Sequence, residues 1–278
     1  MDITFRRVAF QGEAGAYSEA AASEHFSSPI ETIPQLSFEA VFQSVVEGDC
    51  DAGLIPIENS LAGSIHHNYD LLLRHDLNVI GEHFLPIHHC LIGHPGVLLK
   101  EIRKIISHPQ ALAQCYGYLR SLPGVESEPV YDTAGSVKIL RKSDDRTLAA
   151  IASRRAAELY GMHILAENIE DHEANITRFL IIASTPAVPG KDAKTSIVFS
   201  LDNQPGALFK ALSVFALRNI DLTKIESRPL VGKPWEYLFY IDFAGSTEDI
   251  VTAHALSHLG EYAVMLRVLG SYPRHRLD

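Results

Sequence analysis

Short apolar runs alternate with amphipathic segments over the first two thirds of the chain. Apolar runs bounded by turn-forming residues are typical of buried strands, and apolar residues three and four positions apart are typical of the helices that cover them. The predicted strands are residues 8–10, 52–57, 104–106, 148–152 and 179–182. The predicted helices are residues 18–26, 38–46, 62–73, 111–119, 136–141 and 154–160. This alternation predicts an α/β domain with largely parallel sheets.

The pattern changes at residues 185–193, where prolines and a glycine predict a linker. We therefore place one domain at residues 1–184 and a second at residues 194–278. In the second domain the predicted strands are residues 195–201, 221–227, 237–243 and 263–269, and the predicted helices are residues 207–217 and 250–259. The resulting order, βαββαβ, is that of the ferredoxin-like fold, which by itself names no function.

Composition narrows the class of protein. The chain has 278 residues, of which 46% are hydrophobic and 21% are charged, as in ordinary globular proteins. Its formal charge of −10 argues against a nucleic-acid binder, which needs a basic surface. No apolar stretch approaches the length of a membrane-spanning helix, and the first residues do not follow the order of a signal peptide. We therefore expect a cytoplasmic protein with no nucleic-acid or membrane partner, whose cysteines are free thiols.

Polar clusters follow several of the predicted strands, at residues 11–15, 58–60 and 107–110. Because ligands of open α/β sheets bind outside the carboxyl ends of the strands, these residues are candidates for a binding site. The glycines of the first cluster, Gly12 and Gly15, lack the full pattern of a nucleotide-binding loop. They fit either an anion held at a helix N-terminus or a tight turn alone.

The sequence gives little support for metal or serine-nucleophile chemistry. Its 14 histidines are not spaced as metal ligands, and it has neither a Cys-x-x-Cys pair nor a Gly-x-Ser-x-Gly motif. We therefore predict no metal. In the last strand of the first domain, alternation places Thr177 and Phe179 on one face and Arg178 on the other. From spacing alone, an edge strand with a surface arginine is the favoured interpretation.

Several segments occur in the order found in a known enzyme family. In the first domain they are PIENSLAG (56–63), SHPQAL (107–112), DTA (132–134) and NITRF (175–179). In the second domain they are NQPGAL (203–208) and IESRP (225–229). The first set resembles prephenate dehydratases, and the second resembles the phenylalanine-binding segments of their ACT regulatory domain. The resemblance extends over about residues 8–272.

The resemblance implies a fold and a reaction. It implies a catalytic domain of two α/β lobes, similar to a periplasmic binding protein, with the active site in the cleft between them, followed by a ferredoxin-like ACT domain. The implied enzyme is a carbon–oxygen lyase that converts prephenate to phenylpyruvate for phenylalanine biosynthesis, with loss of CO₂ and water. Decarboxylation releases the electron pair that expels the ring hydroxyl and completes an aromatic ring, so the implied reaction needs no cofactor.

The resemblance also implies roles for particular residues. Thr177 is expected to donate a hydrogen bond to the leaving hydroxyl, Arg178 to hold the carboxylate that survives, and Phe179 to line a dry wall. Neutral donors to the substrate are expected at Asn59, Ser60, Ser107, Gln110 and Thr133. L-Phenylalanine is expected to bind as a feedback regulator between paired ACT domains, at Asn203, Gly206, Ala207, Leu208, Glu226 and Ser227. Such a site requires a homodimer or homotetramer.

Two other functions fit the same motifs. An arogenate dehydratase would act on the amino analogue of prephenate with the same residues. A non-catalytic amino-acid sensor would combine a binding-protein-like module with an ACT domain. Residues 177–179 favour an enzyme over a sensor, whereas the choice between the two substrates is left open.

Overall fold

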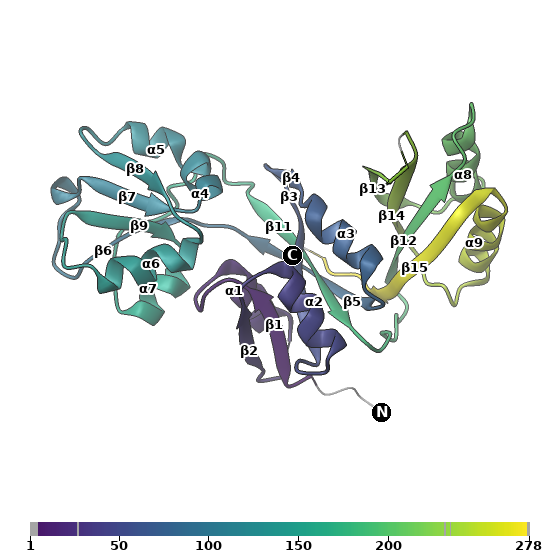
Figure 1. Cartoon of the computed structure of the whole chain (residues 1–278), viewed down its shortest axis with the longest axis horizontal. Coiled ribbons are helices and arrows are strands. Elements are labelled where there is room, and N and C mark those ends of the chain that lie inside the picture. The colour runs from purple at the N-terminus through teal and green to yellow at the C-terminus, as the bar shows by residue number, and fades with distance from the viewer. Residues whose placement is uncertain (1–4, 27, 231, 234, 277–278) are drawn as a thin grey trace. The chain divides into compact units, whose positions relative to one another are not determined.

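The computed structural model describes residues 5–26, 28–230, 232–233 and 235–276 (Figure 1). Its contacts divide the chain into two compact units, each formed by two segments. The first unit comprises Met1–Ile65 and Phe84–Phe179, and the second comprises His66–His83 and Leu180–Asp278. Residues 66–83 therefore pack with the C-terminal part of the chain, although they lie far before the predicted linker in sequence.

The sheet of the first lobe has the strand order β2-β1-β3-β11-β5, and β1 is parallel to both β2 and β3. Its strands are β1 (Arg7–Gln11), β2 (Glu31–Gln35), β3 (Ala52–Asn59), β5 (Asn78–Pro86) and β11 (Ile176–Ala183), with β4 (Gly63–Ser64) paired to the end of β3. Its helices are α1 (Tyr17–His25) and α2 (Phe38–Val46). The central strand β3 is buried along nearly its whole length, which accounts for its continuous apolar sequence.

The sheet of the second lobe has the order β10-β6-β9-β7-β8. Its strands are β6 (Cys90–Gly93), β7 (Lys104–Ser107), β8 (Glu126–Pro129), β9 (Leu148–Ala152) and β10 (His163–Ala166). The helical elements are η1 (Leu99–Glu101), α4 (Pro109–Gln114), α5 (Tyr116–Arg120), α6 (Thr133–Lys142) and α7 (Arg154–Tyr160). β7 is parallel to β8 and β9, whereas β6 is antiparallel to β9 and β10.

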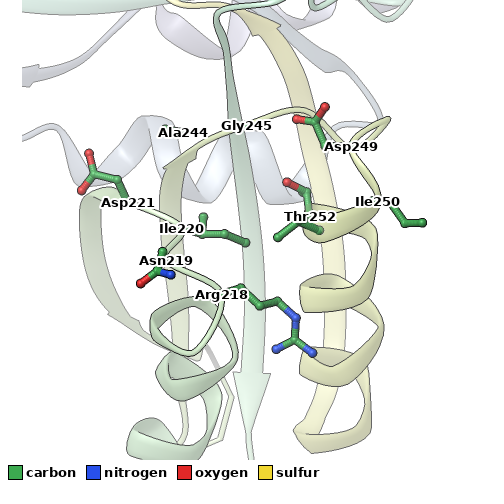
Figure 2. Close-up of a pocket in the computed structure, with 10 residues that line it drawn as sticks. Arg218, Asn219, Ile220, Asp221, Ala244, Gly245, Asp249, Ile250 and Thr252 are labelled. Atoms are coloured by element: carbon green, nitrogen blue, oxygen red, sulfur yellow. The ribbon is translucent and has the colours of Figure 1, made fainter.

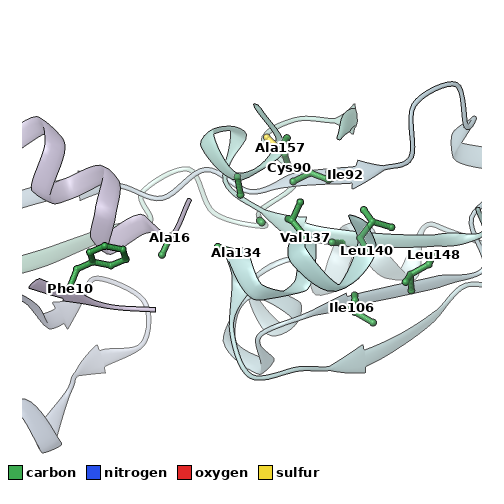
Figure 3. Packing of buried hydrophobic residues seen from close by; sticks show 13 residues of the cluster. Phe10, Ala16, Cys90, Ile92, Ile106, Ala134, Val137, Leu140, Leu148 and Ala157 are labelled. Carbon is green, nitrogen blue, oxygen red and sulfur yellow. The ribbon is translucent and has the colours of Figure 1, made fainter. Parts of the chain in front are cut away.

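The apolar core beneath α6 extends to the first lobe. Val137 and Leu140 of α6 belong to one buried cluster with Leu148 of β9 (Figure 3). Phe10 of β1 and Ala16, which precedes α1, are members of the same cluster. The two lobes of the first unit therefore share buried apolar surface, which stabilises their contact.

The C-terminal sheet has the antiparallel order β13-β14-β12-β15. Its strands are β12 (Ala193–Leu201), β13 (Leu222–Pro229), β14 (Tyr237–Ala244) and β15 (Ala263–Pro273), and its helices are α8 (Ala207–Ala216) and α9 (Ile250–Tyr262). Phe199, Phe215, Phe243 and Leu259 form the core between this sheet and the two helices. The βαββαβ order predicted from the sequence is confirmed.

The other face of this sheet contacts α3 (His66–Arg74). Tyr240 Oη donates to the Tyr69 carbonyl over 2.9 Å, and the two rings are 4.9 Å apart. Arg267 donates to the carbonyls of Leu73 over 3.1 Å and His75 over 2.9 Å. A guanidinium at the carboxyl end of a helix satisfies its last carbonyls and complements its dipole. The C-terminal sheet therefore stabilises a helix that lies well before the predicted linker in sequence.

Local composition explains where the predicted elements differ from the observed ones. The helix predicted from residue 62 begins at His66, because Gly63 and Ser64 pair with the end of β3. β2 contains Pro34, and β5 is interrupted by polar residues, so neither has the apolar run of a typical strand. Both strands are stabilised by neighbours that are distant in sequence.

Candidate active site and regulatory segment

Three helices of the second lobe begin directly after its parallel strands. α4 follows β7, α6 follows β8, and α7 follows β9. The side chains of His108, Asp132 and Ser153 cap these helices by accepting backbone N–H groups. Because parallel strands end at the same edge of a sheet, the segments that contain Ser107, Gln110 and Thr133 lie along one edge.

This edge contacts the loop that follows β1 in the first lobe. Ser153 Oγ donates to the Gly15 carbonyl over 2.8 Å, and Lys138 Nζ donates to Glu13 Oε2 over 2.7 Å. A Cβ atom on Gly15 would lie 2.9 Å from Ala156 Cα, and the φ angle of Gly15 is +92°. Glycine is therefore required here both by the left-handed backbone and by the close approach of the two lobes.

The anion held by this loop comes from the protein itself. Gly15 N donates to Glu19 Oε2 over 2.6 Å, and Thr32 Oγ1 donates to Glu19 Oε1 over 2.9 Å. Arg155 Nε of the second lobe lies 3.3 Å from Glu19 Oε2. Burial alone would raise the pKa of Glu19, but the Gly15 N–H and the Arg155 guanidinium outweigh it, and the pKa lies below its usual value. Of the two interpretations of the glycines, the structure supports the tight turn.

The hydroxyl expected to act in catalysis is held by an amide. Asn59 Nδ2 donates to Thr177 Oγ1 over 3.0 Å and to Asn175 Oδ1 over 2.8 Å. Asn59 Oδ1 accepts from Leu61 N over 3.0 Å and Ala62 N over 2.9 Å, which fixes the orientation of the amide. Thr177 Oγ1 accepts from Asn59, so its own proton can go to another acceptor, and no described residue accepts it.

Arg178 is not a surface residue of an edge strand. β11 lies between β3 and β5 in the sheet, and Arg178 is only 6% exposed. Its guanidinium lies over the Phe84 ring, 6.0 Å from the ring centroid. The edge-strand interpretation is wrong, because spacing within β11 carries no information on the strand that pairs beside it. Phe179 is also buried.

Two of the predicted neutral donors stabilise the protein itself. Ser60 Oγ donates to the Ala174 carbonyl over 2.6 Å and accepts from Ile176 N over 2.9 Å, which fixes the start of β11. Ser107 is fully buried, and its hydroxyl donates to the Ile151 carbonyl over 2.6 Å, which joins β7 to β9. The position of Ser107 does not support its predicted contact with a substrate.

The other two second-lobe donors are more accessible. Gln110 is exposed in the first turn of α4, and Thr133 is half-buried at the start of α6. Beside Thr133, the Asp132 carboxyl is largely buried, and burial raises its pKa. A Cβ atom on Gly12 would lie 2.9 Å from Asp132 Oδ2, so this carboxyl approaches the first lobe. Asp132 and Asn175 are polar groups at this site to which the sequence assigned no role.

The predicted phenylalanine-binding residues lie toward one end of the C-terminal sheet. β12 and β13 are both antiparallel to β14, so they end at the same edge, and residues 203–208 follow β12 there. Ser227 lies opposite Phe239, whose ring stacks on Phe199 in the core. Glu226 lies opposite Tyr240, on the face that contacts α3. Ser227 therefore lies on the face of the sheet that α8 covers, and Glu226 lies on the opposite face. Helix α8 begins at Ala207, directly after Gly206.

A pocket of about 470 Å³ lies at the opposite end of α8 (Figure 2). Arg218, Asn219 and Asp221 line it after α8, and Asp249 and Thr252 line it at the start of α9. Asp249 Oδ2 accepts from Ser246 N over 2.8 Å in the turn before α9, and its side chain makes no capping hydrogen bond to that helix. None of the predicted phenylalanine-binding residues lines this pocket.

Among the residues described, no group of three or more His, Cys, Asp or Glu side chains is placed to hold a metal ion. The described helices include none with the length and apolarity needed to cross a membrane.

Family comparisons agree with this arrangement of lobes and sheets. The model of the family "Prephenate dehydratase" matches residues 8–187, and the model of the "ACT domain" matches residues 195–252. The chain belongs to the prephenate dehydratase family. It is a carbon–oxygen lyase of the class formed by prephenate and arogenate dehydratases, with an ACT domain after its catalytic domain.

Two similar proteins are described as dehydratases, and a third similar structure carries a different description. "Arogenate dehydratase/prephenate dehydratase 2, chloroplastic" of Arabidopsis thaliana is 50% identical, and the match covers 96% of this chain and 72% of that protein. The structure of an Arthrobacter aurescens prephenate dehydratase in complex with L-Phe has a TM-score of 0.88 and 34% identity, over 96% of this chain and 90% of that one. A structure described as a novel type of quorum-quenching acylase has a TM-score of 0.89 and 37% identity. The match covers 97% of this chain and 98% of that one.

The comparisons correct the predicted location. We expected a cytoplasmic protein, but the relatives from Arabidopsis thaliana are named as chloroplastic enzymes. The prediction was wrong because the motifs of a prephenate dehydratase describe the folded enzyme, whereas the compartment is determined by separate targeting signals.

Proposed function

We propose that this member of the family acts on prephenate and that Thr177 donates the hydrogen bond that assists loss of the ring hydroxyl. The observation that carries the proposal is the contact between Asn59 Nδ2 and Thr177 Oγ1, at 3.0 Å. Because the threonine oxygen accepts there, its proton is directed to a different partner, as a donor to a leaving group requires.

The reaction requires two bonds to break. The bond from the ring to its carboxylate breaks, and its electron pair moves into the ring as CO₂ leaves. The C–O bond to the ring hydroxyl then breaks, and the departing oxygen takes up one proton and leaves as water. Prephenate dianion and one proton thus give phenylpyruvate anion, CO₂ and water. An alcohol is a weak acid, so Thr177 acts as a positioned donor while the proton itself comes from solvent.

Arg178 is proposed to bind the side-chain carboxylate, which persists in the product. A contact with the ring carboxylate would oppose its loss as neutral CO₂, because it would stabilise the ground state more than the transition state. Burial of the guanidinium among β5 and β11 strengthens its attraction for an anion. Phe179 and the second-lobe residues Gln110 and Thr133 are proposed to complete the substrate site.

Charge favours prephenate over arogenate, which carries an ammonium group. None of the proposed substrate-binding side chains is a carboxylate. Asp132 beside Thr133 is used as the cap of α6, and Glu13 and Glu19 at the contact between the lobes are paired with Lys138 and Arg155. An ammonium group needs an anionic or carbonyl partner when it is removed from water. We therefore expect a higher kcat/KM for prephenate than for arogenate.

The test is an assay of the purified chain with each substrate, in which phenylpyruvate or phenylalanine formation is measured. Thr177→Ala should lower kcat by about 10²-fold or more with little change in KM, as expected for loss of a positioned donor. Thr177→Ser, which keeps the hydroxyl, serves as the matched variant. If the wild-type chain converts neither prephenate nor arogenate, the enzyme function is contradicted and an amino-acid sensor is favoured. Unchanged turnover of Thr177→Ala would contradict the role of Thr177.

Regulation by L-phenylalanine is the second part of the proposal. The Arthrobacter aurescens prephenate dehydratase was solved in complex with L-Phe, and this chain has the matching ACT domain. We propose that Asn203, Gly206, Ala207, Leu208, Glu226 and Ser227 contribute to the site in a homodimer or homotetramer. Phe209 and Leu208 are exposed at the start of α8, as apolar residues at a subunit interface would be in a single copy. Light scattering with and without phenylalanine measures the assembly, and a monomer would contradict it.

A further inference from the structure

His89 lies on one of the two connections between the lobes of the first unit. This connection, residues 87–89, joins β5 to β6, and the second, residues 167–175, joins β10 to β11. The two are bonded to each other at both ends: Ile169 N donates to the His89 carbonyl over 3.1 Å, and Ile87 N donates to the Asn175 carbonyl over 2.7 Å. The position of the first connection therefore determines that of the second.

The side chain of Glu170 adds a further bond between the connections. Glu170 Oε2 accepts from His89 N over 2.8 Å, and Glu170 Oε1 lies 2.8 Å from His88 Nδ1. Burial alone would raise the pKa of Glu170, but these two contacts outweigh it and lower the pKa below its usual value. The carboxylate is thus ionised and engaged at both oxygens.

The His89 ring joins a helix of one lobe to a helix of the other. Its Nδ1 lies 2.8 Å from Tyr17 Oη, at the start of α1 in the first lobe. Its Nε2 lies 2.9 Å from Gln114 Oε1, at the end of α4 in the second lobe. His89 is 2% exposed, and Ala16 and Cys90, the neighbours of Tyr17 and His89, belong to the same buried cluster (Figure 3). Both ring nitrogens are therefore used within the protein.

The protonation of this group follows from its partners. The Gln114 oxygen can only accept, so His89 Nε2 donates to it, and the single proton of Tyr17 Oη faces two acceptors, His89 Nδ1 and the His88 carbonyl, which lies 2.7 Å away. Burial lowers the pKa of His89 and raises that of Tyr17 well above its usual value. The other ionisable groups around the ring are Glu170, His88, Cys90 and Cys115. The ring is therefore a buried neutral link between Gln114 and Tyr17, and Tyr17 contacts both His88 and His89 of the first connection.

The second connection leads directly to the proposed catalytic residue. Asn175 ends it, and its side-chain oxygen accepts from Asn59 Nδ2, the same group that holds Thr177. A change in the position of this connection would thus move Thr177 and Asn59 relative to the second lobe. Misplacement of a reacting group by about 1 Å can cost about 10²-fold in rate.

We propose that His89 is a positioning residue for the dehydration, because its ring holds Tyr17 of the first lobe and Gln114 of the second and so fixes the connections that place Thr177. This inference rests on the proposed function. It assigns His89 no contact with the substrate, since its ring nitrogens are occupied and its surface is buried.

The test removes each arm of the bridge separately. Tyr17→Phe and Gln114→Leu should each lower kcat about tenfold, with KM for prephenate within about twofold of wild type, because the substrate contacts remain and only their alignment for the transition state changes. The losses of the two single variants should not multiply in the double variant, since both break the same bridge. Tyr118→Phe is the control, because the described residues provide no hydrogen-bond partner for that buried hydroxyl.

Rescue separates positioning from general stability. His89→Gln keeps a donor and an acceptor and should retain clearly more turnover than His89→Phe, with all assays run well below the unfolding temperature of each variant. Normal kcat in Tyr17→Phe and Gln114→Leu would overturn the proposal. It would also be overturned if the fold-loss of kcat in the double variant equalled the product of the fold-losses in the two single variants. If His89→Phe does not fold, the Tyr17 and Gln114 variants still decide. Inactive wild-type protein would instead contradict the proposed function itself.

Discussion

His66 Nε2 lies 3.1 Å from Glu226 Oε1 and joins the first turn of α3 to β13. One turn further along α3, Asp70 Oδ2 lies 3.0 Å from Arg228 Nη2. Positions four apart on a helix share a face, as do positions two apart on a strand, so the two pairs form one continuous contact. A helix that begins shortly after the Asn59 loop is thereby bonded to the strand that contains the predicted effector residues.

Replacing His66 by Ala should strengthen phenylalanine binding. If the effector uses the Glu226 carboxylate, it competes with His66 for that group. A partly exposed pair of this kind contributes about 0.2–1 kcal/mol, so its loss should lower the dissociation constant of phenylalanine about 1.4- to 5-fold. Isothermal titration calorimetry on the full chain measures this directly. Glu236→Gln, which breaks the exposed pair of Lys233 and Glu236 near the same strand, is the control. Weaker phenylalanine binding in His66→Ala would contradict competition.

Asn59→Asp should lower kcat about 10²-fold, because a carboxylate cannot donate to Thr177 Oγ1 and would accept the threonine proton instead. The substitution preserves size, so the loss reports on the direction of the hydrogen bond. Asn219→Asp makes the same chemical change in the C-terminal unit and should leave turnover unaltered. Steady-state kinetics with prephenate decide, and normal kcat in Asn59→Asp would show that Thr177 does not depend on this amide.

The buried thiols provide a prediction about reactivity. Cys50, Cys90 and Cys115 are all free and buried. Burial raises the pKa of Cys90 to about 11, and it raises the pKa of the other two thiols as well. Because the thiolate is the reactive form, native protein at pH 8 should react slowly with a thiol reagent, and unfolded protein should react at all three sites. Fast reaction of the native protein would contradict this burial.

A structural feature can be predicted from the sequence alone when the residues that determine it lie close together in the chain. The C-terminal strands and helices follow local periodicity closely, and α7 is found at the predicted residues 154–160. Arg178 shows the limit of this reasoning. Its place inside the sheet depends on β5, whose polar Glu82 and His83 hide its character as a strand. Only pairing over a long sequence distance determines such a position.

At the candidate site, too, the motifs identify residues, whereas their hydrogen-bond partners depend on contacts that are distant in sequence. The motifs predicted roles for Thr177 and Asn59, which are 118 residues apart in sequence and in hydrogen-bond contact. Residue type alone could not separate Ser107, whose hydroxyl is used inside the sheet, from the exposed Gln110. His89 had no local signal, since its function as a bridge depends on one partner from each lobe.

Lys194 and Glu82 form a buried ion pair whose disruption should strongly destabilise the second unit. Lys194 Nζ lies 2.6 Å from Glu82 Oε1 and 2.7 Å from Oε2, and the two side chains are 5% and 0% exposed. Lys194→Met leaves a buried carboxylate without its cation and should cost about 3–5 kcal/mol in the free energy of unfolding. By contrast, Arg276→Met removes an exposed pair with Asp192 and should cost less than about 1 kcal/mol.

The double variant Lys194→Met/Glu82→Leu gives the sharper comparison for this pair. Replacing both charges by apolar side chains removes the need to desolvate either, so the double variant should be more stable than Lys194→Met alone. Urea unfolding followed by circular dichroism gives the free energies, and hydrogen exchange of the amides in β12 and β5 assigns the change to this unit. If Lys194→Met is no less stable than Arg276→Met, the pair is too hydrated to act as a buried one, and the packing of β5 with β12 must depend on its apolar neighbours.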